Sequence, residues 1–478
     1  MASVNVLFLL ADDMGAWALG AAGNADVRTP HLDALAERGV LVQNFFCVSP
    51  VCSPARASLL TGAIPSAHGV HDWISAGHAR SDRIDFLAGQ RLVTAEFAEH
   101  GYDVGLIGKW HLGASDQPHP EFSHWFALEG GDSSYHCADM FRGEQHETVT
   151  GYLTDVFADE AIAYLDARTG ERPFFLSVNF TAPHRPWLNQ HPLEWEAEYR
   201  DCAFKSVPTQ EPVHAWSTLV NGRPAAADDD QQASRIGYFA SISAMDAAIG
   251  RILDQLEECG LADTTLVVFT SDNGFNLGHH GIWGKGNGTK PQNMYDTSVK
   301  VPLVIAGPGI EPGVRTEALL SAYDLAATLL QMTDNDPAPF EQGPGQSFAS
   351  ALRGDILEER PVVVYDEYGP TRMIRTGEWK YIHRSPDGPH ELYHLAVDAE
   401  ERHNLIDDPL QREWVDHLRA ELSGWFSRYA IADADGVGLP VSGDGQHALT
   451  AADAFDHAPR ERWIPGGLPQ PSGRPSPS

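Results

Sequence analysis

The chain alternates short apolar runs with longer amphipathic stretches. Apolar runs of about strand length occupy residues 4–10, 104–107, 174–180 and 265–270. Residues 29–38 and 234–259 instead repeat their apolar positions every three to four residues, as one face of a helix does. The shorter of these two stretches begins at Thr29, a residue type that caps helices, and stops before Gly39. Strands that alternate with helices predict an α/β fold, a large mostly parallel sheet with helices on both faces.

The pattern changes after about residue 345. Residues 362–365, 371–375 and 379–383 are short strand-like runs separated by Gly and Pro turns, and residues 410–426 have the spacing of a helix. We therefore expect a large domain over residues 1–345 and a smaller C-terminal α+β subdomain with an antiparallel sheet over residues 346–463. Residues 464–478 are rich in Pro, Gly and Ser, which predicts a disordered tail.

Composition restricts the partners. The chain has 33 basic and 66 acidic side chains, a formal net charge of −33. Such a surface repels nucleic acid and anionic lipid, so we expect neither a nucleic-acid nor a membrane partner. An anionic substrate would need a local positive pocket. The five cysteines are sparse and lack zinc-binding spacing, which argues against a disulfide framework.

The N-terminal apolar run bears on localisation. Residues 4–10 have strand length, with no basic region or small-residue cleavage site beside them, so we interpret them as a core strand and not as a signal peptide. If the numbering starts at the natural N-terminus, the expected location is cytoplasmic. If a signal has been removed, the protein would be periplasmic or secreted.

Reactive side chains follow four of the apolar runs. They are Asp12 and Asp13, Lys109 and His111, His184, and Asp272 and Asn273. Ligands of open parallel sheets bind outside the carboxyl ends of the strands, so neighbouring runs would bring these side chains to one crevice. Carboxylate and amide oxygens suit a hard cation such as Ca²⁺ or Mg²⁺. Taken alone, each acidic pair is equally typical of an ordinary turn.

The segment Cys52-Ser53-Pro54-Ala55-Arg56 opens a predicted helix. A cysteine at a helix start lies near the positive end of the helix dipole, and Arg56 lies one turn further on the same face. A buried structural cysteine would also fit this pattern. A phosphatase-type thiolate loop does not fit, because only three residues separate Cys52 from Arg56.

These motifs resemble the cysteine-type sulfatases of the alkaline-phosphatase superfamily. The Cys52–Arg56 segment followed by Leu60-Thr61-Gly62 is similar to the family signature. The resemblance extends in family order from residue 4 to about residue 410. Its further motifs are Thr29-Pro30-His31, Gly108-Lys109-Trp110-His111, Ala182-Pro183-His184, Ser271-Asp272-Asn273-Gly274 and Glu391-Leu392-Tyr393.

The resemblance implies a mechanism. Cys52 would be converted to formylglycine by a separate formylglycine-generating enzyme. Its hydrate would attack sulfur, and the resulting sulfated hemiacetal would expel sulfate by returning to the aldehyde, an exit that a thiol lacks. One Ca²⁺ or Mg²⁺ would be bound by modified Cys52 together with Asp12, Asp13, Asp272 and Asn273. Arg56 would orient the nucleophile, Lys109 and His184 would bind the sulfate, and His111 would assist proton removal.

One part of the family pattern is ambiguous here. The family has a sulfate-binding lysine before a Tyr-acidic pair, which corresponds to Tyr295 and Asp296. The intervening segment is longer than usual, so both Lys285 and Lys290 are candidates. Lys285 follows a bulky anchor and a flexible glycine, and we predict that it is the sulfate ligand.

Several alternatives remain from the sequence. A phosphonate monoester or phosphodiester hydrolase of the same superfamily would need the same site, and an unmodified binding homologue would keep the pocket without catalysis. The substrate is expected to be a small-molecule or oligosaccharide sulfate ester, with a sulfated carbohydrate as first choice. Trp187 and Trp283 could stack on a sugar ring or simply pack in the core.

Overall fold

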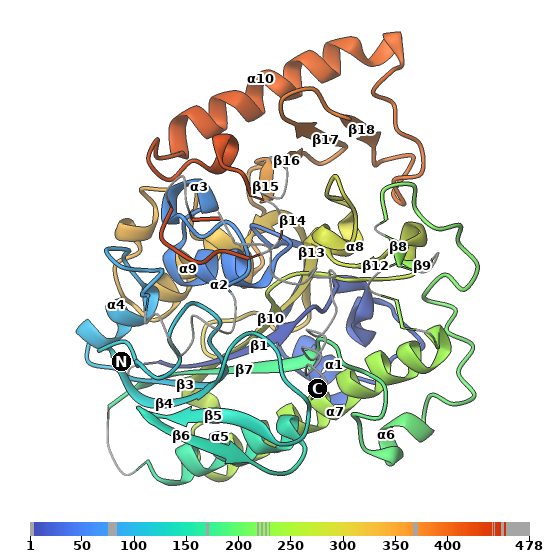
Figure 1. The fold of residues 1–478 in the computed structure, drawn as a ribbon. Helices are drawn as coiled ribbons and strands as arrows, with labels where there is room; N and C mark the ends of the chain where they lie inside the picture. The colour runs from blue at the N-terminus through green and yellow to red at the C-terminus, as the bar shows by residue number, and fades with distance from the viewer. Residues whose placement is uncertain are drawn as a thin grey trace, which may run out of the picture.

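The computed structural model describes residues 4–74, 84–168, 172–217, 219–220, 223–224, 227–228, 230–366, 371–441, 443, 445–450 and 454–455. A ten-stranded sheet forms its centre, in the order β14-β2-β13-β10-β1-β7-β3-β4-β5-β6 (Figure 1). Its five middle strands are mutually parallel: β10 (Thr265–Ser271), β1 (Asn5–Asp12), β7 (Phe174–Pro183), β3 (Asp103–Lys109) and β4 (Phe122–Leu128). This confirms the predicted α/β architecture.

The two edges of the sheet are mixed. Beyond β10, β13 (Lys300–Ala306) is antiparallel to both neighbours, and β2 (Val40–Phe46) pairs in parallel with β14 (Val314–Ser321). Beyond β4, the strands β5 (Ala138–Arg142) and β6 (Gln145–Val149) form an antiparallel hairpin. The functional strand ends therefore lie in the parallel middle of the sheet.

Helices cover both faces because the middle strands are apolar on both sides. Along β1, Val6, Phe8 and Leu10 pack into one core cluster, while Leu7, Leu9 and Ala11 pack into another. The first cluster contains α2 (Cys52–Thr61), α4 (Val93–Glu99) and α9 (Leu325–Met332). The second contains α1 (Pro30–Glu37), α5 (Leu153–Asp166) and α7 (Gln231–Glu258). Figure 1 shows these groups on opposite sides of the sheet.

The start of α1 differs from the prediction in one respect. Thr29 occupies the N-cap position, but its side chain makes no capping bond. The carboxylate of Asp246 on α7 accepts hydrogen bonds from the amides of His31 at 3.1 Å and Leu32 at 2.8 Å instead. Burial raises the pKa of Asp246 to about 6. A buried side chain from another helix thus satisfies the amides that a local cap would bind.

Helix α7 is the longest helix among the described residues. It begins three residues before the predicted start, because the Asp230 side chain accepts a bond from the amide of Ala233 and caps it. By length and composition α7 could cross a membrane, but 83% of its most apolar window is buried within the fold. It is the central core helix under the sheet.

The C-terminal part forms the predicted antiparallel sheet. Its strands are β15 (Val362–Asp366), β16 (Thr371–Arg375), β17 (Trp379–Arg384) and β18 (Glu391–His394), of which β18 was not predicted. Helix α10 (Arg412–Tyr429) packs against β16 and β17 at the top of the view in Figure 1. The division at residue 345 stays a prediction, and the predicted tail 464–478 lies outside the described residues.

Short elements complete the connections. They are α3 (Pro65–His68), α6 (Leu193–Ala197), α8 (Asp296–Val299), β8 (Leu219–Val220), β9 (Arg223–Pro224), β11 (Asn276–Leu277) and β12 (Trp283–Gly284). All five cysteines lie in described segments, and no disulfide joins any two of them in the structure.

Candidate active site

The polar residues predicted from the strand ends come together at one edge of the sheet. Strands β10, β1, β7 and β3 are consecutive neighbours, and each delivers its side chains at its carboxyl end. Asp12 ends β1, Lys109 ends β3, His184 follows β7 and Asp272 follows β10. The parallel direction of these strands is the reason that residues far apart in sequence meet.

Three carboxylates form the centre of the site. Ligand oxygens of Asp12, Asp13 and Asp272 lie within 4.8 Å of one another, and all three side chains are buried. The side-chain nitrogen of Asn273, Nδ2, donates to Asp13 Oδ1 at 2.7 Å. The side-chain oxygen of Asn273, Oδ1, is buried without a hydrogen-bond partner. Buried polar atoms are almost always bonded, so this oxygen is an expected ligand position. The donor set, all oxygen, fits Ca²⁺ or Mg²⁺.

Cys52 is the first residue of α2 and faces the carboxylates. Its Sγ lies 3.3 Å from Asp12 Oδ1 and 4.0 Å from Asp13 Oδ1. One turn further, Arg56 donates from Nε to Asp272 Oδ2 at 2.9 Å, and its Nη2 lies 3.5 Å from Asp12. The predicted helix start therefore brings the cysteine and the arginine to the same carboxylate group.

Two lysines contact the carboxylates of the site. Lys109 is fully buried and donates to Asp12 Oδ2. Lys285, which follows β12, donates to Asp13 Oδ1 at 2.6 Å and to Cys52 Sγ at 2.7 Å. Lys290 is exposed, and its backbone amide is bonded to the Trp216 carbonyl at 2.8 Å. The geometry therefore favours Lys285 over Lys290 for a role at Cys52.

The two histidines occupy different positions. His184 Nε2 lies 3.8 Å from Asp13 Oδ2, and its Nδ1 shares a hydrogen bond with the Arg185 carbonyl at 2.7 Å. His111 is buried, with Nε2 at 2.9 Å from the Ile74 carbonyl and Nδ1 without a hydrogen-bond partner. The His111 carbonyl accepts a bond from Ser53, the neighbour of Cys52, at 2.8 Å. His184 thus lies directly beside the carboxylates, whereas the bond from Ser53 connects the backbone of His111 to helix α2.

Burial and opposite charges shift the titration of the site. Burial alone would raise the pKa of Asp12, but Lys109 and other nearby cations hold it well below its usual range. Burial, reinforced by the charge of Asp12, raises the pKa of Asp272 to about 6. Burial also raises the pKa of the Cys52 thiol, and the negative charge of Asp12 adds to this effect. Burial and the charge of Asp12 thus both disfavour the thiolate form of an unmodified Cys52.

Uncommon backbone conformations shape the strand ends. Asp13 has a φ of 67° and His111 a φ of 57°, a left-handed region that non-glycine residues seldom adopt. Tyr238 on α7 donates to the Asp13 carbonyl at 2.9 Å and helps to hold this conformation. Gly108 is required just before Lys109, because a Cβ there would lie 2.1 Å from the Asn179 carbonyl oxygen.

Several supporting residues were not predicted from the sequence. The Asn179 side chain donates to the Lys109 carbonyl at 3.0 Å, and Asn293 donates to the Lys285 carbonyl at 3.0 Å. Tyr238 lies within the apolar stripe of α7, where nothing local marks its contact with Asp13. A polar residue inside a buried strand, as Asn179 is in β7, was the only available signal.

The two tryptophans considered as sugar platforms are core residues. Trp187 is 1% exposed and packs edge-on against Phe275, and Trp283 is 3% exposed beneath the guanidinium of Arg235. Neither offers a free ring face, so the packing alternative is correct for both.

Comparison with known proteins identifies the family. The Sulfatase family model matches residues 4–335, and the model of the N-sulphoglucosamine sulphohydrolase C-terminal region matches residues 278–427. A buried cysteine surrounded by carboxylates and cations at the carboxyl edge of an α/β sheet defines a hydrolase of tetrahedral oxyanion esters. The chain belongs to the Sulfatase family and is a sulfuric ester hydrolase.

Relatives match over most of the chain. Choline-sulfatase of Rhizobium meliloti is 27% identical over 85% of this chain and 83% of its own length. The ulvan-active sulfatase of Formosa agariphila is 29% identical over 88% and 80%. A solved complex with the substrate D-glucosamine-2-N,6-O-disulfate shares the fold, with a TM-score of 0.77 and 24% identity over 90% of this chain and 99% of that one.

The contrast between the two lysines generates a prediction. Lys285→Ala should lower turnover at least about 100-fold on every sulfate ester tested, because it removes a largely buried cation that donates to Cys52 Sγ. Lys290→Ala, the matched control on the same loop, should leave turnover of a small aryl sulfate within about 3-fold. Steady-state kinetics with both variants decides the matter, and the opposite pattern would overturn the assignment.

Proposed function

We propose that the protein hydrolyses a sulfate ester of a carbohydrate, with Cys52 converted to formylglycine and one divalent cation bound beside it. The position of Cys52 carries the proposal. Its Sγ lies between the ammonium of Lys285 at 2.7 Å and the carboxylate of Asp12 at 3.3 Å. The hydrated aldehyde supplies a nucleophilic oxygen at this place, and the proposal includes a formylglycine-generating enzyme as the maturation partner.

The proposed cation site consists of Asp12, Asp13, Asp272 and Asn273, with modified Cys52 as a further ligand. The buried, unbonded Asn273 Oδ1 and the clustered carboxylate oxygens support this assignment. A bound Ca²⁺ or Mg²⁺ supplies Lewis-acid polarisation of the nucleophile and of the sulfate oxygens. It would also neutralise carboxylates whose charge is otherwise compensated by Arg56, Lys109 and Lys285.

The remaining residues act on charge and protons. Lys109 and Lys285 stabilise negative charge on the sulfate as it is transferred, because Lys109 is fully buried and the Lys285 side chain is only 12% exposed, where charge interactions are strong. Arg56 holds Asp272 and orients the nucleophile at the start of α2. His184 binds the sulfate or the leaving oxygen, and His111 receives the proton that leaves residue 52 when sulfate is expelled.

The substrate class rests on the relatives. They include the ulvan-active sulfatase and an N-acetylglucosamine-6-O-sulfatase of Bacteroides thetaiotaomicron, which is 26% identical over 84% of this chain and 82% of its own length. The C-terminal region matches the model of N-sulphoglucosamine sulphohydrolase. Two of these relatives and the C-terminal family model carry the names of enzymes for sulfated sugars, which supports a sulfated sugar as the substrate class.

The first test concerns the nucleophile. In active protein, the peptide that contains Cys52 should be about 18 mass units lighter than its thiol form, since a carbonyl oxygen replaces the thiol and a hydrogen. Specific activity should rise in proportion to the converted fraction when the protein is coexpressed with a formylglycine-generating enzyme. Ser53→Ala serves as a control that keeps Cys52. Full activity of wholly thiol protein or of Cys52→Ala would falsify the mechanism.

The second test concerns the cation. Adding Ca²⁺ or Mg²⁺ to chelator-treated protein should raise its unfolding temperature. At a free cation concentration of 100 times the dissociation constant, the gain in the free energy of unfolding is roughly 2.7 kcal/mol. Asp272→Asn and Asn273→Ala should weaken or abolish this shift and the binding heat measured by calorimetry. Asp139→Asn is the matched control, because Asp139 belongs to a separate surface cluster with Glu129 and His146. If Asp139→Asn alone abolished the shift, the cation site would be elsewhere.

The third test concerns the substrate. Matured enzyme should show its highest kcat/KM on defined sulfated saccharides, above choline sulfate and a simple aryl sulfate, because ring hydroxyls add contacts that small esters lack. A phosphonate monoester and a phosphodiester belong in the same panel. The phosphonate monoester hydrolase of Agrobacterium radiobacter shares the fold at a TM-score of 0.67 and 24% identity, over 89% of this chain and 96% of that one. Preference for choline sulfate or for a phosphoryl substrate would contradict the proposal.

A further inference from the structure

Strand β17 of the C-terminal sheet has two faces with different partners. Alternate residues of a strand point to opposite faces, so Lys380, Ile382 and Arg384 share one side. On the other side, Trp379 stacks on Trp414 of α10 with ring centroids 5.0 Å apart. The hydrophobic face thus attaches α10, while the face with two basic residues is directed to the rest of the molecule.

Arg384 binds the segment that follows Lys285. Its side chain is 1% exposed, and its Nε and Nη2 donate to the Gln292 carbonyl at 3.1 and 2.6 Å. Its charge is balanced by Glu391 at 2.6 Å. The guanidinium also lies 4.8 Å from the ring centroid of Trp216, whose carbonyl accepts the amide of Lys290. Arg384 therefore contacts this loop directly at Gln292 and indirectly through Trp216.

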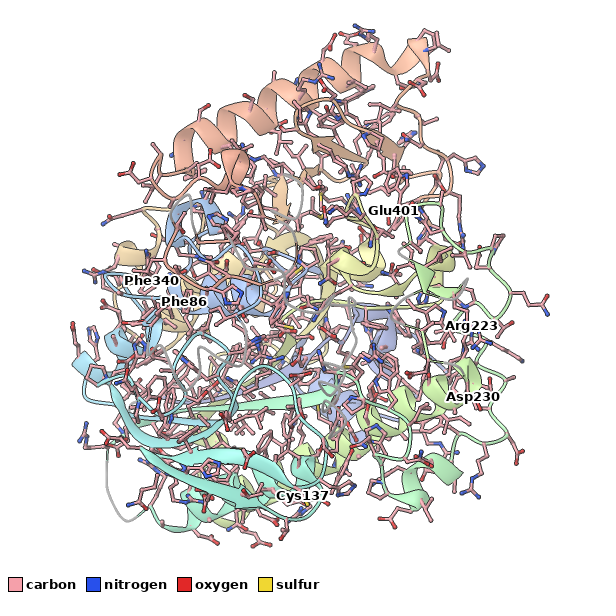
Figure 2. The ribbon with its side chains drawn as sticks, viewed as in Figure 1. Phe86, Cys137, Arg223, Asp230, Phe340 and Glu401 are labelled. Carbon is pink, nitrogen blue, oxygen red and sulfur yellow. The ribbon has the colours of Figure 1, made fainter. Side chains whose placement is uncertain are left out.

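Lys380 binds the same segment two residues further on. It is fully buried and donates to the Met294 carbonyl at 2.8 Å, to Asp296 Oδ1 at 2.5 Å and to Glu401. Glu401, labelled in Figure 2 beneath the C-terminal sheet, accepts the amide of Asp296 at 2.7 Å and so holds the start of α8. A buried ammonium with this many partners fixes the backbone of its partners.

Asn293 connects these anchors to the site. It stands between Gln292 and Met294, the two residues whose carbonyls Arg384 and Lys380 hold. Its side-chain nitrogen donates to the carbonyls of Lys285 at 3.0 Å and Gly286 at 3.1 Å. Hydrogen bonds from β17 to the backbone on either side of Asn293, followed by the bonds of the Asn293 side chain, thus connect β17 to the backbone of the lysine that contacts Cys52.

We propose that Arg384 and Lys380 are positioning residues for Lys285, so that the C-terminal sheet sets the place of a cation in the active site. The inference rests on the role proposed above for Lys285. An ammonium stabilises transferred charge according to its distance, and a displacement of about 1 Å can lower a rate by as much as about 100-fold. The loop that carries Lys285 contains Gly286 and Gly288, and external anchors restrict its freedom.

A double-mutant cycle on matured full-length enzyme tests the proposal. Arg384→Met should lower kcat on a small aryl sulfate about 10- to 100-fold, and Arg384→Lys should restore part of the loss. In the Lys285→Ala background, Arg384→Met should change kcat less than about 3-fold, because the residue that it positions is already absent. Equal losses in both backgrounds would show a general structural effect and would overturn the inference.

Controls separate positioning from instability. Arg384→Met leaves the buried Glu391 without its partner, so Arg384→Met/Glu391→Gln is made in parallel and should show the same coupling to Lys285. Arg360→Met removes another arginine paired with a buried carboxylate, Asp324 at 2.5 Å; this arginine also donates to the Pro344 carbonyl, and neither partner belongs to the Lys285 loop. It should lower the unfolding temperature while kcat of the folded enzyme stays within about 3-fold. A comparable kcat loss in Arg360→Met would contradict specific positioning.

The proposed function and this inference fail in distinguishable ways. If Lys285→Ala keeps full turnover, the proposed role of Lys285 is wrong and the positioning role is overturned with it. If Lys285→Ala loses its turnover but Arg384→Met lowers kcat by the same factor with and without Lys285, only the positioning role is wrong.

Discussion

The mutual compensation of buried charges at the carboxyl edge of the sheet is the constraint on which the rest of the structure depends. Asp12, Asp13 and Asp272 lie within 4.8 Å of one another in a site without exposed carboxylates. Like charges so close, out of water, are strongly unfavourable unless cations are interleaved with them. Arg56, Lys109 and Lys285 supply these cations from three different elements, so each element must be held in register with the others.

This requirement explains the arrangement of the supporting structure. Tyr238 on α7 fixes the backbone of Asp13, Asn179 on β7 fixes that of Lys109, and Asn293 fixes that of Lys285. None of these residues contributes charge to the site. They bond to backbone carbonyls and so fix the distances between the charged side chains. These distances matter because charges interact more strongly when they are buried. The sheet places the acids and Lys109, helix α2 places Arg56, and the loop that contacts the C-terminal sheet places Lys285.

The sequence predicted the acids well and the supports poorly, for a physical reason. Asp12 and Asp272 each follow a buried strand, so an apolar run ending in a carboxylate marks them locally. Asp246, Tyr238 and Arg384 act on partners 215, 225 and 92 residues away in the chain. Nothing in their immediate sequence indicates those contacts. The same limit applies to Thr29. Threonine often caps helices, but here Asp246 accepts the amide bonds in its place.

The choice between Lys285 and Lys290 shows how local pattern and tertiary structure combine. Both lysines follow a glycine-containing stretch, and the spacing alone left the rival open. The structure separates them because Asn293 reaches back to the Lys285 carbonyl, while the amide of Lys290 is bonded to Trp216 and its side chain is exposed. The segment is therefore held at Lys285 by Asn293 and at the Lys290 amide by Trp216, and the Lys290 side chain lies at the surface.

The strongly negative chain is compatible with the cluster of Arg56, Lys109 and Lys285 in the site, because the two act on an anion at different distances. A net charge of −33 repels an anion at a distance, but salt screens this repulsion beyond roughly 8–10 Å. In the proposed site, Lys109 and Lys285 would lie close to the transferred group, and their attraction would be screened far less because Lys109 is buried and Lys285 is only 12% exposed. Recognition of an anionic ester then depends on contacts made within the pocket. This is the reason that the exact placement of Lys285, and hence of the carbonyls held by β17, has consequences for catalysis that the overall charge does not.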